Sequence, residues 1–167
     1  LEESAAALDA LRTWLARRGG EIEMLFVAYN SVLVNVWLGR YIEAQHFAED
    51  TFRRVEEIGG AAMRGIGLAM RGWVAVHTGR EREALADLTA ALESAARSES
   101  SSWWVDLART GLARLEVSAD RHAEALKILE PLLAVADAVP NTEICTMEYL
   151  PDAIEAIFPR DELILLA

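Results

Sequence analysis

Few residues in this sequence could carry out chemistry. The three histidines, His46, His77 and His122, are far apart, and none has another His or Cys three or four residues away. Glu43, His46 and Glu49 would share one face of a helix and could hold a metal ion, but a charged helix face is more often simply solvated. We therefore predict no metal site.

Nucleophilic catalysis has equally little support. Cys145 is the only cysteine, and a lone cysteine is more often a small buried apolar residue than a nucleophile. Ser98–Ser102, interrupted by Glu99, is typical of a loop and helix cap, and no arrangement of Ser or Cys beside His is recognisable. We expect no catalytic residue, no cofactor and no enzymatic activity in this chain.

Composition narrows the possible partners. The net charge of −11 argues against direct contact with nucleic acid. No apolar run approaches the ~20 residues of a membrane helix, and the acidic start is unlike a signal peptide. The single cysteine fits the reducing cytoplasm. The apolar run Leu163–Leu166 leads us to expect that both ends are cuts through a longer chain, with a homodimer through these ends as a possible consequence.

A repeat organises the chain. Three segments share the pattern of a turn residue, Arg, two variable positions, Glu and Ala, and they start 40 and 41 residues apart. These segments are Gly39–Ala44, Gly79–Ala84 and Asp120–Ala125. Such spacing lies in the range of helical-hairpin repeats.

The pattern has a mechanical meaning. Gly39 and Gly79 can adopt the left-handed conformation that ends a helix, and Asp120 is a tolerable substitute. The Ala that closes each segment gives the small surface needed where two antiparallel helices touch. Seven residues before each turn the opposing helix carries Val32, Gly72 and Ala113.

These signals predict one all-α domain over residues 1–167. We expect helices at 2–17, 21–38, 42–58, 61–77, 82–97, 102–117, 123–138 and 143–157. They form repeats at about 21–58, 61–97 and 102–138, a partial repeat at 143–167, and at 1–17 the end of a preceding repeat. Antiparallel hairpins of this kind stack into a right-handed superhelix with a concave face.

The pattern resembles the tetratricopeptide repeat, although its period exceeds ~34 residues and each repeat lacks the usual closing Pro. Two motifs near the end, Ala125–Leu133 and Tyr149–Ala156, resemble the repeat region of large ATP-binding LuxR-type transcriptional regulators from actinobacteria. The resemblance implies a region that receives a protein partner or a small inducer. Nucleotide and DNA binding would belong to other domains, because the chain has no phosphate-binding loop and no basic recognition helix.

The concave face is the predicted binding site. Superposing the turns on the tetratricopeptide pattern points one stripe of each hairpin's first helix into the groove. The stripes are Phe26, Tyr29, Leu33 and Val36, then Ile66, Ala69, Trp73 and Val76, then Leu107, Thr110, Arg114 and Val117. Tyr29, Leu33, Trp73 and Arg114 are the candidate binding residues, and an apolar helix or an apolar small molecule with one acidic group would suit them. Alternatively, neighbouring helices fill this surface.

Two functions follow from this interpretation. The first is a regulatory or sensor domain that binds a partner or inducer in its groove. The second is a tetratricopeptide-like scaffold for protein–protein interaction or oligomerisation in a signalling protein that does not regulate transcription.

Overall fold

All secondary structure in the described part of the chain is helical. The computed structural model describes residues 1–98, 103–138 and 148–158. Its helices are α1 (Glu2–Arg18), α2 (Glu21–Trp37), α3 (Tyr41–Ile58), α4 (Ala61–His77), α5 (Glu81–Ser98), α6 (Trp103–Ser118), α7 (His122–Ala138) and α8 (Leu150–Ile157). The all-α prediction is confirmed. None of the described helices is long and apolar enough to cross a bilayer.

The first seven helices begin and end within one residue of the predicted positions. The last helix differs, because α8 begins at Leu150 and Glu148 and Tyr149 form a turn. Pro151 fits this start, since proline lacks an N–H and is favoured in the first turn of a helix. Residues 143–147 of the predicted helix lie outside the described part.

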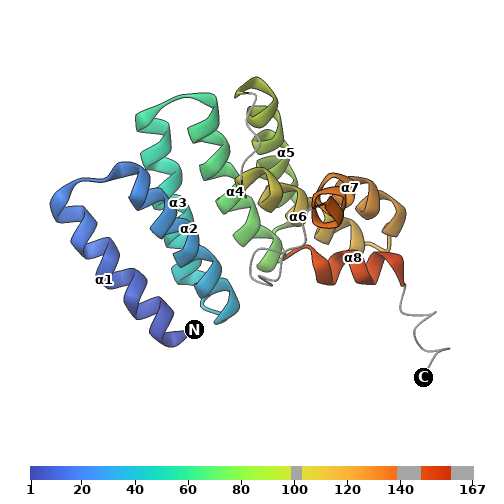
Figure 1. Ribbon diagram of the computed structural model, residues 1–167, viewed down its shortest axis with the longest axis horizontal. Coiled ribbons are helices and arrows are strands. Elements are labelled where there is room, and N and C mark those ends of the chain that lie inside the picture. Colours follow the sequence, from blue (N-terminus) through green and yellow to red (C-terminus); the bar gives the residue numbers. More distant parts are fainter. Residues whose placement is uncertain (99–102, 139–147, 159–167) are drawn as a thin grey trace.

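Successive helices pack side by side along the chain. Each helix contacts the next, from α1 at one end of Figure 1 to α7 and α8 at the other. The first helices of successive hairpins also meet, because α4 contacts both α2 and α6, and α6 contacts α8. This pattern of neighbour contacts is consistent with a solenoid of helical hairpins.

The three predicted turns have the same backbone geometry. Gly39, Gly79 and Asp120 adopt φ angles of 72°, 69° and 56°, and Asp120 is the only non-glycine residue with positive φ in the described ranges. The N–H of the following arginine donates to the carbonyl five residues earlier, at 2.8 Å after Gly39 and 2.9 Å after Gly79 and Asp120. This is the Schellman ending of a helix, formed three times.

Small residues bring the paired helices close together. Ala44, Ala84 and Ala125, which close the repeated segments, are fully buried. Gly72 of α4 faces Leu88 of α5, where an added Cβ would lie 2.7 Å from the leucine side chain. The small residues therefore lie at the contacts between helices, as the repeat predicts.

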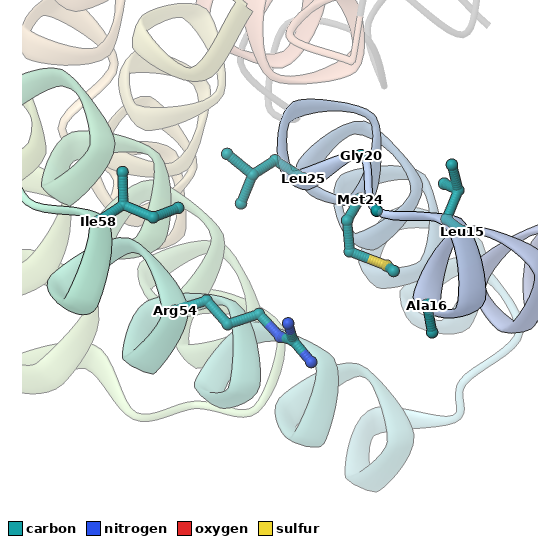
Figure 2. A pocket seen from close by; sticks show the side chains of 8 residues that line it. Leu15, Ala16, Gly20, Met24, Leu25, Arg54 and Ile58 are labelled. Carbon is teal, nitrogen blue, oxygen red and sulfur yellow. The ribbon is translucent and has the colours of Figure 1, made fainter.

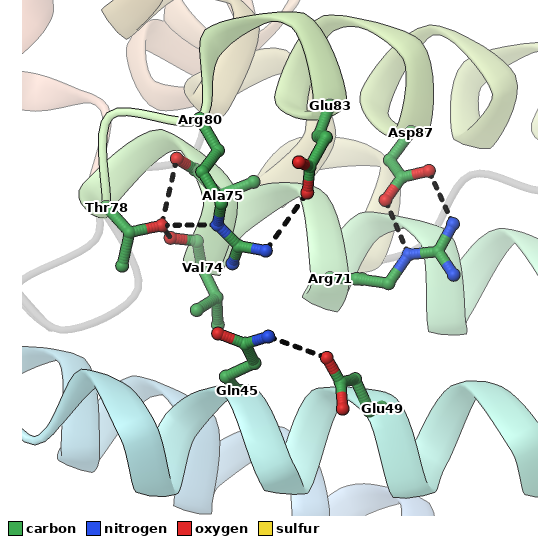
Figure 3. A network of polar contacts seen from close by, with 9 residues as sticks. All are labelled: Gln45, Glu49, Arg71, Val74, Ala75, Thr78, Arg80, Glu83 and Asp87. Atoms are coloured by element: carbon green, nitrogen blue, oxygen red, sulfur yellow. Dashed lines mark hydrogen bonds and ion pairs between the residues drawn. The ribbon is translucent and has the colours of Figure 1, made fainter.

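An ion pair on the side of the α4–α5 hairpin adds to this contact. Arg71 of α4 donates two hydrogen bonds, of 2.6 and 2.7 Å, to Asp87 of α5 (Figure 3). Its guanidinium also lies over the ring of Phe52 in α3, 4.1 Å from the centroid. The hydrogen bond to Asp87, opposed by partial desolvation, raises the pKa of Arg71. One arginine thus ties three consecutive helices together.

Candidate ligand groove

A groove of about 800 Å³ opens between the first helices of the chain and α6. Four elements line it: α1, α2, α6 and the turn before α8. The lining side chains are Ser4, Ala7, Leu8, Leu11, Phe26, Tyr29, Asn30, Leu33, Val34, Trp37, Trp103, Asp106, Leu107, Thr110, Glu148 and Tyr149. The volume lies within the usual range for small-molecule sites, about 300–1,000 Å³.

The wall of the groove is apolar and reaches solvent. Leu11, Phe26 and Trp37 are 43%, 56% and 42% exposed. Trp103 of α6 closes the groove toward α2, because its ring lies 4.1 Å from that of Tyr29 and 6.2 Å from that of Phe26, centroid to centroid. Exposed apolar groups gathered in one concavity are typical of a surface that binds something.

The groove's charged lining residues are both acidic. Asp106 lies at the outer rim, where Arg109 is 3.8 Å away, while Glu148 lies deeper, in the turn before α8. Both carboxylate oxygens of Glu148 are buried and lack a hydrogen-bond partner. Burial raises the pKa of Glu148 to about 7, although the positive charge of Arg114 acts in the opposite direction. No Lys, Arg or His is among the described residues that line the groove.

Glu148→Gln tests this burial. Between pH 4.5, the ordinary value for Glu, and about pH 7, folded Glu148 keeps a proton that the unfolded chain releases. Folding stability from this group is therefore fully present at low pH and is lost as the pH rises through about 7. Relative to the parent, the variant should gain about 2–3 kcal/mol in free energy of unfolding between pH 5 and pH 8. Urea unfolding of both proteins at the two pH values measures this change.

Comparing two pH values cancels the fixed cost of a buried amide. Glu124→Gln on α7 is the matched control, because Glu124 is 55% exposed and pairs with Lys127 at the surface. The difference in free energy of unfolding between Glu124→Gln and the parent should be the same at both pH values. A Glu148→Gln difference that is also independent of pH would mean that Glu148 is solvated in the folded chain.

The four predicted site residues are divided between the groove and the core. Tyr29 and Leu33 line the groove. Trp73 is only 1% exposed and lies in the core, and Arg114 is outside the groove lining. Trp73 is covered by the ring of His77, 4.4 Å away between centroids, and by the guanidinium of Arg114, 5.1 Å from its ring centroid.

Arg114 joins three helices instead of facing solvent. It contacts Asp152 of α8 at 3.1–3.2 Å, and its guanidinium lies over the ring of Trp73 in α4, 5.1 Å from the centroid. Its Nη1 lies 2.6 Å from Nε2 of His77. Arg114 is thus already paired with a carboxylate, which argues against the acidic ligand that we expected from the sequence.

The contact with Arg114 fixes the proton on His77. Since a guanidinium can only donate, Nε2 of His77 must accept, and the proton must lie on Nδ1. Nδ1 then donates to the carbonyl of Trp73 at 2.9 Å. Desolvation lowers the pKa of His77, Arg114 lowers it further, and the backbone hydrogen bond acts against both. His77 is therefore a neutral connector within the fold.

No protein-family model, curated protein or solved structure matches this chain. The groove is therefore interpreted from its own residues and geometry.

Sequence reasoning missed several lining residues that the repeat itself could have indicated. Trp103 lies four residues before Leu107 and extends the predicted stripe of α6 by one turn. Glu148 follows Leu107 by 41 residues, the same spacing as Gly79 to Asp120, and so occupies the equivalent position in the next repeat. Leu8 and Leu11 had no such signal, because α1 is the second helix of its hairpin and our superposition used first helices only.

The other candidate sites gain no support from the structure of the described residues. Within residues 1–98, 103–138 and 148–158, no three His, Cys, Asp or Glu side chains form a metal-binding group, and Glu43, His46 and Glu49 are exposed. Cys145, Leu163–Leu166 and Glu99–Ser102 lie outside the described residues.

Figure 2 shows a second pocket, between the α1–α2 turn and α3, toward which Arg54 extends. Its volume of about 110 Å³ is small for an organic ligand.

Proposed function

We propose that this chain is a sensor domain that binds a small organic molecule in the groove between α1, α2, α6 and the turn before α8. Ligand binding there would link helices from hairpins that are distant in the sequence. In a solenoid each repeat touches mainly its neighbours, so a ligand that bridges α2 and α6 would change the curvature of the whole stack. A change in curvature is a signal that other domains can receive.

The observation that carries this proposal is the exposed aromatic wall. Phe26 and Trp37 are large apolar side chains that face solvent inside a concavity of about 800 Å³. Isolated exposed apolar residues are common, but a cluster that lines one cavity favours a binding site. The acidic, unpartnered Glu148 at its inner end supplies a specific polar contact.

The resemblance to LuxR-type regulators supplies the wider role. In this proposal the chain is the inducer-binding repeat region of a cytoplasmic transcriptional regulator, and its hairpins form a right-handed superhelix. A phosphate-binding loop before the chain and a basic helix-turn-helix after it, read from the surrounding gene, would support that role. If the surrounding gene encodes neither, the sensor would belong to another kind of signalling protein.

Trp37→Ala tests the groove directly. Trp37 is 42% exposed and lines the groove, so its removal should weaken binding strongly and cost less stability than the loss of a core tryptophan. In a thermal-shift screen of diverse small molecules, compounds that stabilise the parent should lose about tenfold or more in affinity for the variant. A ligand present at about 100 times its Kd adds about 2.7 kcal/mol to stability, which such a screen detects easily.

Ile42→Ala provides the matched control for this screen. Ile42 is also an exposed apolar residue, at 71% against 42% for Trp37, but lies on α3 outside the groove. The control should bind like the parent. If no compound stabilises the parent, or if every stabilising compound binds Trp37→Ala equally well, the groove is not the sensor site.

An interaction scaffold is the second candidate function, and the surface of α8 favours it. Ile154, Ile157 and Phe158 are 55%, 48% and 45% exposed at this end of the described chain. An apolar row on a helix surface is suited to packing against another helix. Sedimentation of the chain with Ile154→Glu would test this role, because a dimer or partner complex that persists in the variant does not use α8.

A further inference from the structure

The chemistry of the groove defines the class of its ligand, provided that the groove is the binding site proposed above. Among its lining side chains, the aromatic rings and the carboxylates are the groups that can attract a positive charge. Trp37, Trp103 and Tyr29 supply the rings, and Asp106 and Glu148 supply the carboxylates. No described cationic side chain lines the groove to neutralise them.

The nearest positive charges already have acidic partners. Arg109 lies beside Asp106 at the outer rim, 3.8 Å away. Arg114 acts on Glu148 only at a distance, because its donors are directed to Asp152 and His77. Glu148 therefore keeps two buried acceptor oxygens with no donor. A buried acceptor without a donor is costly, and a ligand that brings a donor removes that cost.

We propose that the groove binds an organic cation: an apolar, preferably aromatic or alkyl, body that carries a protonated amine, with the ammonium group bonded to Glu148 and the body lying against Trp37, Trp103 and Tyr29. An ammonium supplies up to three donors and a full positive charge. Aromatic faces attract the same charge within about 6 Å. A carboxylate ligand at the inner end would meet the like charge of Glu148 and no free cation, because Arg109 is paired with Asp106 at the rim.

The experiment compares three probes with one skeleton. Phenylbutylamine, phenylbutanol and phenylbutyrate differ mainly in the charge of the head group, and isothermal titration of the full 167-residue chain at pH 8 measures their affinities. We expect the amine to bind about tenfold or more tightly than the alcohol, and the acid to bind most weakly. In Glu148→Gln, the advantage of the amine over the alcohol should largely disappear, while Glu124→Gln should retain it.

The pH dependence gives a second readout. The charged group that acts on Glu148 is Arg114 on α6, which in turn contacts Asp152 of α8 and His77 of α4. Asp106, also on α6, acts on the neighbouring Tyr149. Burial raises the pKa of Glu148 to about 7, so the amine should bind more tightly at pH 8 than at pH 6. The affinity of Glu148→Gln should be nearly constant over this range.

Each alternative result contradicts the inference in a distinct way. If the alcohol or the acid binds as tightly as the amine or more tightly, the ligand is not a cation, but the groove can still be the proposed sensor site. If none of the three probes binds, the inference of a cationic ligand is also contradicted. The compound screen with Trp37→Ala then decides whether the groove is a binding site. A chain that sediments as a dimer and becomes monomeric in Trp37→Ala would place a second copy in the groove and overturn the inference.

Discussion

Leu88→Ala should lower the free energy of unfolding by about 3–4 kcal/mol. Leu88 is completely buried on α5. It packs against Gly72 of α4 and Gly111 of α6, where an added Cβ would lie 2.7 Å from the leucine side chain in both cases. The two glycines leave a space that this one side chain fills. Removing it opens a cavity between three helices whose backbones are already in close contact, so the site can collapse only slightly.

Leu85→Ala on the same helix is the matched control. Leu85 is 50% exposed, so the same substitution should cost less than about 1 kcal/mol. Urea unfolding followed by circular dichroism measures both variants. Similar losses for Leu85 and Leu88 would mean that α5 is not held through this contact, and the role given to Gly72 and Gly111 would be wrong.

The turns show why so much of the fold could be predicted from the sequence. A Schellman ending needs a residue that tolerates positive φ, and Gly39, Gly79 and Asp120 supply it at nearly constant spacing. Small residues at Gly72 and Ala84 then place the two helices of a hairpin in contact. These requirements are local and repeated, so they can be read without knowing the tertiary structure.

The groove was harder to predict because it depends on how closely the hairpins approach. Superposition on a repeat pattern predicted that Tyr29 and Leu33 face a groove, and both line the groove between α2 and α6. It also placed Trp73 there, but the guanidinium of Arg114 lies over its ring, and Trp73 is part of the core. That contact joins residues of different repeats, and no spacing within one repeat specifies it.

The charge of the groove was hard to predict for the same reason, as Arg114 shows. From the sequence it was the only charged residue in the predicted stripes, which suggested an acidic ligand. Its partner Asp152 lies 38 residues further along the chain, in a helix whose start the sequence placed several residues too early. Once Asp152 neutralises Arg114, the charge of the groove is set by Asp106 and Glu148, and the expected ligand changes sign.

Asp152→Ala is expected to cost about 2–3 kcal/mol and to loosen α8 specifically. The side chain of Asp152 is only 8% exposed, and that of Arg114 is 27% exposed. Burial raises the pKa of Asp152 while Arg114 lowers it, so the pair balances desolvation against attraction. Removing the carboxylate leaves Arg114 with its charge partly buried and unpaired, and this orphaned charge is the main cost.

Lys127→Ala on α7 is the control for Asp152→Ala, because it breaks an ion pair at the surface without leaving a buried charge. Lys127 and Glu124 are 70% and 55% exposed, so breaking their contact should cost less than about 1 kcal/mol. Hydrogen exchange adds a local readout, since the amides of α8 should exchange faster in Asp152→Ala while those of α3 and α4 keep the protection of the parent. Uniform loss of protection would indicate that Arg114 supports the whole stack, and unchanged protection in α8 would mean that apolar packing of Ala153 and Ala156 alone holds that helix. Because Glu148 lies in the turn before α8, a loosened α8 should also weaken binding of the amine, which would link the Arg114 cluster to the groove through one short helix.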